Sequence, residues 1–200
     1  MRMTTDRVRN APGRAAAEAF LAEHIPSDSQ RFSIEPEERE RMAGWRPSVV
    51  LVTKDRRKDI VAVAHLGLPY ADVLSDTMAL GLPVGPEEVT TMTAWMLHGI
   101  AVAPSVRGQG VGVALLRQAE DLARAAGGTE VIGVGDDNNI GFYRTLGYLT
   151  STVHAVLAVP GRDGRLRNVL SPLKQGLGLH WFCKPLDGPR TVWLQEELAT

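Results

Sequence analysis

A glycine-rich turn in the middle of the chain has the composition of a site for a phosphate group. Residues 107–112 read Arg-Gly-Gln-Gly-Val-Gly, between an expected strand at 94–102 and an expected amphipathic helix at about 111–126. A helix N-terminus presents unpaired N–H groups and about half a positive charge, and glycines let an anion approach the backbone. The turn is therefore a predicted anion-binding site, beside which Arg107 can donate a charge-assisted hydrogen bond.

The spacing of these glycines excludes two common nucleotide-binding loops. The nucleoside-triphosphate loop needs a Lys directly after its second glycine, and no such Lys follows here. The dinucleotide fingerprint needs Gly-x-Gly-x-x-Gly, but Val113 occupies the place of the third glycine. The pattern that does fit is Arg-x-x-Gly-x-Gly, formed by Arg107, Gly110 and Gly112.

A second motif follows at residues 138–148, which read Asn-Asn-Ile-Gly-Phe-Tyr-Arg-Thr-Leu-Gly-Tyr. Together with Gly99–Gly112, this segment resembles the GNAT superfamily of N-acetyltransferases. The resemblance runs from about Trp95 to Tyr148 and extends loosely over the rest of the chain. It implies an enzyme that moves the acetyl group of acetyl-CoA onto an amine.

The resemblance also implies which residues contact the cofactor. Backbone groups of 100–102 would pair with the pantetheine arm as an added strand does, and N–H groups of 107–112 would hold the pyrophosphate. Asn138 or Asn139 would bond the pantetheine amides, and Phe142 would pack against them. Where the family often has an asparagine and an alanine, this chain has Asp136 and Asn139. The implied cofactor-binding residues are Ile100, Ala101, Val102, Arg107, Gly108, Gln109, Gly110, Val111, Gly112, Asn138, Asn139, Phe142 and Tyr143.

Acetyl transfer needs a base for the amine and an acid for the leaving thiolate. A lysine-like amine has an ordinary pKa near ~10.4 and a thiol one near ~8.5. The resemblance implies Tyr143 as the general acid. His98, on the same strand face as Val102, is the candidate base, because some arylalkylamine-acetylating relatives have a histidine there. The alternatives are that His98 only lines the site, or that Glu87 and Glu88 act through water.

The acceptor is expected to be a small cationic amine. From Asp59 to Val106 the sequence contains no Lys or Arg, whereas it contains Asp72, Asp76, Glu87 and Glu88. A negative wall attracts a cation, which favours a polyamine, an amino sugar or an amine antibiotic. Two alternatives remain: acetylation of a macromolecule (a protein N-terminus, a lysine or a tRNA-linked amine), and a non-catalytic acyl-CoA sensor.

Composition indicates a cytoplasmic protein that binds neither nucleic acid nor a membrane. The formal net charge of the 200 residues is −1, and no stretch approaches the roughly 18 apolar residues of a membrane span. Cys183 is the single cysteine, so the chain can form no internal disulfide. No metal site is expected, because His180 and Cys183 have no second Cys/His pair. The resemblance allows a homodimer formed through the terminal strands.

The expected elements define one α/β (α+β) domain, residues 1–200, with its cofactor-binding core at about 94–150. We expect a GNAT-like, mixed but mostly antiparallel sheet flanked by helices. A long loop at 69–91, with a short helix around 70–80, would border the acceptor. The expected order is helix 13–24, helix 35–41, a hairpin of strands 48–52 and 60–64, strand 94–102, helix 111–126, strand 131–134, helix 138–146, and strands 150–159 and 180–185.

Overall fold

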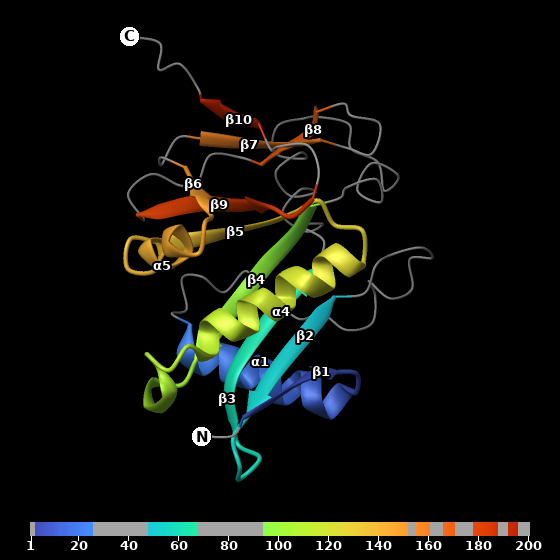
Figure 1. Cartoon of the computed structure of the whole chain (residues 1–200), viewed down its shortest axis with the longest axis vertical. Coiled ribbons are helices and arrows are strands. Elements are labelled where there is room, and N and C mark those ends of the chain that lie inside the picture. The colour runs from blue at the N-terminus through green and yellow to red at the C-terminus, as the bar shows by residue number, and fades with distance from the viewer. Residues whose placement is uncertain are drawn as a thin grey trace. The chain divides into compact units, whose positions relative to one another are not determined.

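The computed structural model describes residues 3–25, 48–67, 94–151, 155–160, 166–170, 178–187 and 192–195. These residues, whose helices and strands are drawn in Figure 1, belong to two compact units. The first unit comprises residues 1–67 and 97–122, and the second comprises 68–96 and 123–200. None of the helices that the structure describes has both the length and the hydropathy of a membrane span.

Among the described residues, seven strands form one sheet and three form another. The seven-stranded sheet has the order β1 (Thr4–Val8), β2 (Val49–Lys54), β3 (Ile60–Gly67), β4 (Ala94–Val102), β5 (Glu130–Asp136), β9 (Leu179–Pro185) and β6 (Leu149–Thr150). The three-stranded sheet has the order β10 (Val192–Gln195), β7 (Ala155–Pro160) and β8 (Leu166–Leu170).

The strand pairs whose register is defined within the described residues run antiparallel. The antiparallel pairs are β1–β2, β2–β3, β5–β9, β6–β9, β7–β8 and β10–β7. The neighbours β4 and β5 are joined through helix α4 (Val111–Ala125), the kind of crossover that parallel neighbours require. The expected α+β class, with a mixed and mostly antiparallel sheet flanked by helices, is confirmed.

The first unit is built on the predicted hairpin of β2 and β3. Its charged turn is closed by Asp55, whose Oδ1 accepts hydrogen bonds from the backbone N–H groups of Arg57 (2.8 Å) and Asp59 (3.0 Å). Such short-range bonds explain why Asp favours turns. Val52 of β2 pairs with Val63 of β3, and both side chains are buried in one apolar cluster.

Helix α1 (Ala11–His24) completes that cluster. The Asn10 side chain caps the helix by accepting from the N–H of Gly13 at 2.8 Å, which places the start two residues before the predicted one. Phe20 and Leu21 pack in the same cluster as Val52 and Val63. In Figure 1, α1 lies behind β2 and β3 while α4 crosses in front of these strands.

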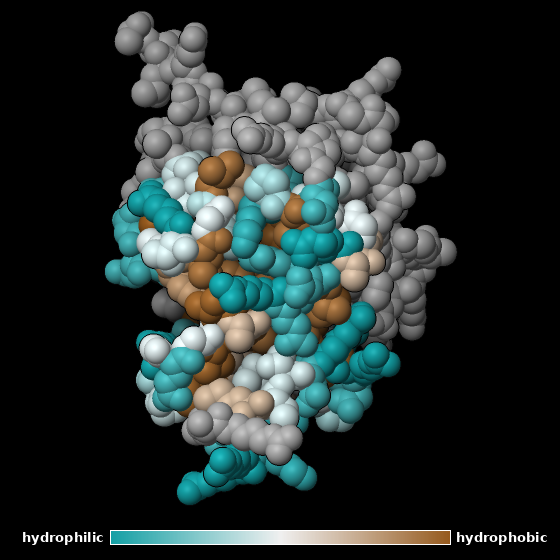
Figure 2. Space-filling view, in the orientation of Figure 1, coloured by the Kyte–Doolittle hydropathy of each residue, from teal (hydrophilic) through white to brown (hydrophobic). Residues whose placement is uncertain are grey.

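Helix α4 follows β4 after the short 3-10 helix η2 (Pro104–Val106) and the glycine turn. Its apolar side chains recur with helical spacing, as predicted, and Leu115, Leu116 and Ala119 are fully buried. The opposite face carries exposed Arg117 and Asp121. This polar face is the hydrophilic band that crosses the space-filling view in Figure 2.

The second unit packs α5 (Ile140–Thr145) on the β5–β9 pair. Gly133 of β5 lies opposite Phe182 of β9, and a Cβ at position 133 would collide with the Phe182 ring. The Phe182 ring instead stacks on Tyr143 of α5, with ring centroids 3.8 Å apart and an interplanar angle of 17°. The missing side chain at 133 therefore makes room for the aromatic contact that positions α5.

One predicted element is wrong, and three strands were not predicted. The single strand expected at 150–159 is two strands in different sheets: Thr150 of β6 pairs with Phe182, and Ala155 of β7 pairs with Gln195. The unpredicted strands β1, β8 and β10 are short, and β1 has one apolar residue, Val8. The helix expected at 35–41 and the loop at 69–91 lie outside the described residues.

Candidate active site

The glycine turn is an open backbone cradle on the protein surface. Gly108 and Gly110 have φ angles of +75° and +78°, a region that L side chains rarely adopt. A Cβ added at either position would meet nothing within 4 Å. Because both residues are exposed as well, the glycines are required by the backbone conformation, and the space beside them stays open.

The start of α4 supplies hydrogen-bond donors to this space. The N–H of Ala114 donates to the Gly110 carbonyl at 3.0 Å, which closes the first turn of the helix. The N–H groups of the residues just before Ala114 have no acceptor within the helix. An open turn followed by such N–H groups fits a diphosphate, so the residues present are suited to the pyrophosphate of coenzyme A.

Arg107 and Gln109 stabilise the turn through side-chain hydrogen bonds to nearby backbone carbonyls. The Arg107 Nε donates to the carbonyl of Val102 at 3.0 Å, and the Gln109 Nε2 donates to the carbonyl of Ser105 at 3.4 Å. The Arg107 guanidinium has further N–H groups, so it keeps donors and charge beside the turn. One lone pair of the Val102 carbonyl, which is expected to face pantetheine, therefore accepts from Arg107.

His98 lies inside the first unit and contacts a second histidine. It is buried in β4, and its ring centroid is 4.9 Å from that of His65 in β3. A Cβ at Gly67 would come within 3.0 Å of the His98 Nε2, so the glycine makes room for the imidazole. His65 has no motif around it, and sequence reasoning gave it no role in the site.

The residues before α5 form a reciprocal hydrogen-bonded turn. The Asp136 Oδ1 accepts from the backbone N–H groups of Asn138 (2.9 Å) and Asn139 (3.0 Å). In return the Asn139 Oδ1 accepts from the backbone N–H of Asp136 at 3.0 Å. Asp136, which departs from the family pattern in sequence, therefore organises this turn. We call residues 136–139 the Asp136 turn.

The close fit of the Asp136 turn depends on Gly135. A Cβ at this position would lie 2.5 Å from the Asn139 Oδ1 and 3.5 Å from the Tyr143 ring. Asn138 and Asn139 are both exposed. The side-chain oxygen of Asn139 accepts a hydrogen bond from the backbone of Asp136. The amide N–H groups of Asn139 are therefore the part of the side chain that can contact a cofactor.

Tyr143 is held in an aromatic cluster and stays protonated. Its side chain is buried between Phe182, on which it stacks, and Tyr148, whose ring centroid is 5.7 Å away. Burial raises the pKa of the Tyr143 hydroxyl well above its ordinary value, and the negative charge of Asp136 raises it further. The phenol is therefore a donor throughout the neutral and mildly alkaline range. Phe142, half-buried, packs edge-on against the Tyr143 ring.

The remaining predicted site residues are Ile100 and Ala101 in β4 and Val111 and Gly112 at the start of α4. Glu87 and Glu88 lie outside the described residues. Within the described ranges, no three His, Cys, Asp or Glu side chains gather as a set of metal ligands. Sequence reasoning missed the role of Asp136, although an Asp that accepts from the backbone N–H two residues on is a common turn signal.

Comparison with known proteins identifies the family. The model of the acetyltransferase (GNAT) family matches residues 17–148. Among solved structures, the ribosomal-protein-S18-alanine N-acetyltransferase from Escherichia coli has a TM-score of 0.54 at 16% identity, with 100% of both chains covered. An N-acetyltransferase from Staphylococcus aureus Mu50 has a TM-score of 0.56 at 13% identity, with 94% of this chain and 100% of that chain covered.

A third solved structure contains the cofactor. The N-acetylglutamate synthase from Neisseria gonorrhoeae, complexed with coenzyme A and N-acetyl-glutamate, has a TM-score of 0.55 at 13% identity. The match covers 94% of this chain and 36% of that chain. No curated protein matches the chain.

The fold and the glycine cradle are those of a coenzyme A-dependent acyltransferase. More narrowly, the chain belongs to the acetyltransferase (GNAT) family, whose model spans both motifs of the sequence. The protein is accordingly an N-acetyltransferase that uses acetyl-CoA.

Proposed function

We propose that the protein acetylates the primary amine of a small cationic molecule, such as a polyamine, an amino sugar or an amine antibiotic. The observation that carries this proposal is the charge pattern between Asp59 and Val106. This span has no Lys or Arg and includes Asp72, Asp76, Glu87 and Glu88. Acids without compensating bases attract a cationic acceptor and disfavour polyanions such as tRNA.

The donor is held along β4 and the start of α4. Backbone groups of residues 100–102 pair with the pantetheine arm, and the cradle at 107–112 takes the pyrophosphate. The Asn138 and Asn139 amides bond the pantetheine, and Phe142 packs against it. The open backbone of Gly108 and Gly110 supports the pyrophosphate assignment, since nothing lies within 4 Å of an added Cβ at either position.

His98 serves as the base that accepts the proton of the acceptor. An amine attacks a carbonyl only in its neutral form, and histidine is the side chain most often used as a general base near neutral pH. The contact between the His98 and His65 rings, 4.9 Å between centroids, fixes the His98 ring inside the strand layer. A fixed imidazole loses little freedom when the acceptor binds, which favours proton transfer.

Tyr143 donates its proton to the leaving sulfur. When bound, acetyl-CoA supplies an electrophilic thioester carbonyl and a thiol leaving group. As the C–S bond gave way to the new C–N bond, His98 would take the amine proton and Tyr143 would donate its proton to the sulfur. Because burial and Asp136 make tyrosinate costly, Tyr143 regains a proton from solvent, and His98 releases its proton to solvent, before the next turnover.

Release of free thiol from acetyl-CoA over a panel of amines tests this function. Polyamines, aminoglycosides and amino sugars should release coenzyme A, and mass spectrometry should find one added acetyl group per reacting amine. Release with peptides or charged tRNA alone would replace the small-molecule acceptor with a macromolecular one. Tight binding of coenzyme A without release from any acceptor would indicate an acyl-CoA sensor.

A further inference from the structure

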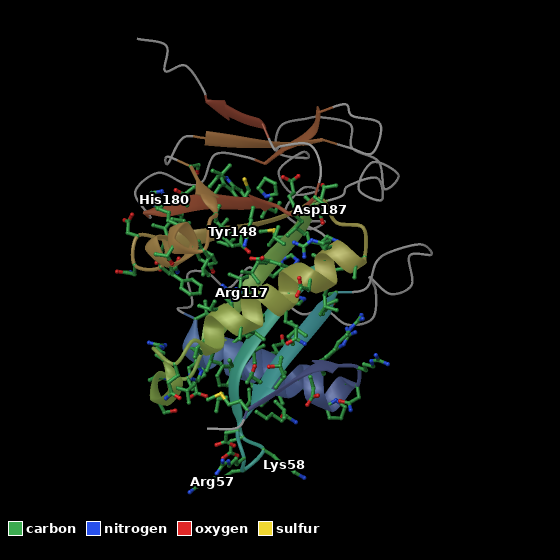
Figure 3. All side chains as sticks on the ribbon, viewed as in Figure 1. Arg57, Lys58, Arg117, Tyr148, His180 and Asp187 are labelled. Carbon is green, nitrogen blue, oxygen red and sulfur yellow. The ribbon has the colours of Figure 1, made fainter. Side chains whose placement is uncertain are left out.

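His180 connects the Asp136 turn to the strands beside it. This histidine lies in β9, at the end that Figure 3 shows next to α5. Its Nε2 is 2.8 Å from the Oδ1 of Asp137, and its Nδ1 is 3.1 Å from the backbone carbonyl of Ser151. The three residues are separated by up to 43 positions in sequence, so no local sequence motif predicts their contacts.

Both partners of the His180 ring are hydrogen-bond acceptors. A backbone carbonyl has no proton to give, and an ionised carboxylate has none either. Each ring nitrogen therefore lies opposite an acceptor and makes a hydrogen bond to it when it carries the hydrogen. Because its acceptor is a carboxylate, the contact of the His180 Nε2 with Asp137 is of the stronger kind of hydrogen bond.

Asp137 is also held through its backbone. Its N–H donates to the carbonyl of Gly178 at 3.0 Å, and Gly178 has a φ of +58°. A Cβ at Gly178 would collide with the Asp137 carboxylate. The Asp136 turn is thus fixed internally by the Asp136–Asn139 pair and externally by contacts from residues 178 and 180.

The meeting of Ser151, His180 and Asp137 is not a nucleophilic triad. The Ser151 hydroxyl oxygen accepts from the backbone N–H of Trp181 at 3.0 Å, and His180 reaches the Ser151 carbonyl instead of its hydroxyl. Ser151 is also buried. This arrangement suits an anchor, because each polar group faces a fixed backbone or carboxylate partner.

We propose that His180 is a positioning residue for cofactor binding, acting through Asp137 on the Asp136 turn. This inference rests on the proposed role of Asn138 and Asn139 as contacts of the pantetheine amides. By tying the turn to Ser151 and β9, His180 keeps both asparagine side chains in the orientation that coenzyme A requires. Without the His180 side chain, the two asparagines are still present, but the turn samples other arrangements. The affinity for coenzyme A therefore falls.

The test compares H180Q, D137N and the double variant. Calorimetry with coenzyme A needs no acceptor, so it works whatever amine the enzyme uses. We expect each single variant to weaken the Kd by about five- to tenfold, and the double variant to weaken it no further, because both substitutions alter the same contact. Hydrogen exchange should rise at residues 136–143 and nowhere else, and the KM for acetyl-CoA should rise with kcat within about twofold.

His24 provides a matched histidine control. Its Nδ1 also bonds a backbone carbonyl, that of Phe20 at 2.9 Å, and its ring stacks on the Phe20 ring. H24Q should therefore leave the Kd for coenzyme A unchanged. D137N keeps the experiment decisive if H180Q does not fold, because 73% of the Asp137 side chain is exposed.

Two results would overturn the positioning role. One is an unchanged Kd for coenzyme A in folded H180Q and D137N, and the other is additive losses in the double variant. Failure of the proposed function is seen separately: the wild-type protein would acetylate no small amine while these Kd values could still be measured.

Discussion

At the scale of single residues, the chemistry depends on where each titratable side chain is buried. Tyr143 and Glu130 are both acids with little or no exposed surface, and in both cases burial favours the neutral form. Neutral Tyr143 can serve as a proton donor. Neutral Glu130 has no part in the proposed chemistry, and its burial instead makes the stability of the fold depend on pH.

Replacing Tyr143 by phenylalanine removes the donor and keeps the ring that stacks on Phe182. We expect kcat to fall at least about tenfold while the Kd for coenzyme A changes less than about twofold. Because the pKa of Tyr143 is raised, the wild-type rate should not decline from tyrosine ionisation between pH 8 and about 10. Steady-state kinetics and calorimetry provide the measurements, and unaltered turnover in Y143F would remove Tyr143 from the mechanism.

Glu130 should make the protein less stable as pH rises through neutrality. The residue is 0% exposed, neither carboxylate oxygen has a hydrogen-bond partner in the described part of the chain, and burial raises its pKa to about 7. In the unfolded chain the pKa returns to about 4.5. The folded state therefore holds a proton more tightly, and its stability is lost as pH rises from about 5 to 8, by roughly 2–3 kcal/mol.

Chemical denaturation of wild type and E130Q over that pH range measures this effect. Glutamine cannot ionise, so E130Q should lose less free energy of unfolding between pH 5 and 8 and should be the more stable protein at pH 8. Parallel pH profiles for the two proteins would show that Glu130 is ionised and accommodated in the folded state.

At the scale of elements, we expect coenzyme A binding to depend on the backbone conformation at the start of α4. The helix is preceded by glycines with positive φ and ends near another, Gly127, with a φ of +77°. The two ends have similar backbone conformations but different surroundings, since only the N-terminal end presents N–H groups to a ligand. This contrast makes Gly110 and Gly127 a matched pair for substitution.

Substitution of Gly110 by alanine should weaken coenzyme A binding about five- to tenfold and lower the free energy of unfolding by about 1 kcal/mol. No atom lies within 4 Å of the new Cβ, so both effects arise from the backbone conformation and not from a clash. G127A should cost similar stability and leave the Kd for coenzyme A unchanged. Equal losses of affinity in both variants would assign the effect to the stability of α4 as a whole.

At the scale of the whole molecule, charge distribution is expected to govern the choice of acceptor. The formal net charge is −1, but the region from Asp59 to Val106 has acidic residues without Lys or Arg. An attraction that comes from such a field is screened by salt, because the Debye length shortens from about 10 Å at 0.1 M to about 3 Å at 1 M.

The KM for a polycationic acceptor should therefore rise several-fold between 0.05 M and 0.5 M salt. Steady-state kinetics with a diamine and with a monoamine of similar size separates charge from shape. A diamine KM that is independent of salt would contradict the proposed acidic attraction.

The sequence by itself determined the elements that depend on neighbouring residues. The glycines of 107–112 and the apolar spacing of α4 predicted the cradle and its helix, since turn conformation and helical periodicity are local properties. The β2–β3 hairpin followed from two β-branched runs and a charged turn, and strand β4 was predicted with its observed bounds.

Only the tertiary structure decided what depends on distant partners. Thr150 and Ala155 belong to different sheets because their partners, Phe182 and Gln195, lie far along the chain. The His180–Asp137 contact spans 43 residues, and the raised pKa of Glu130 comes from burial alone. Local pattern specifies conformation, but pairing, burial and the protonation they impose arise only when remote segments pack together.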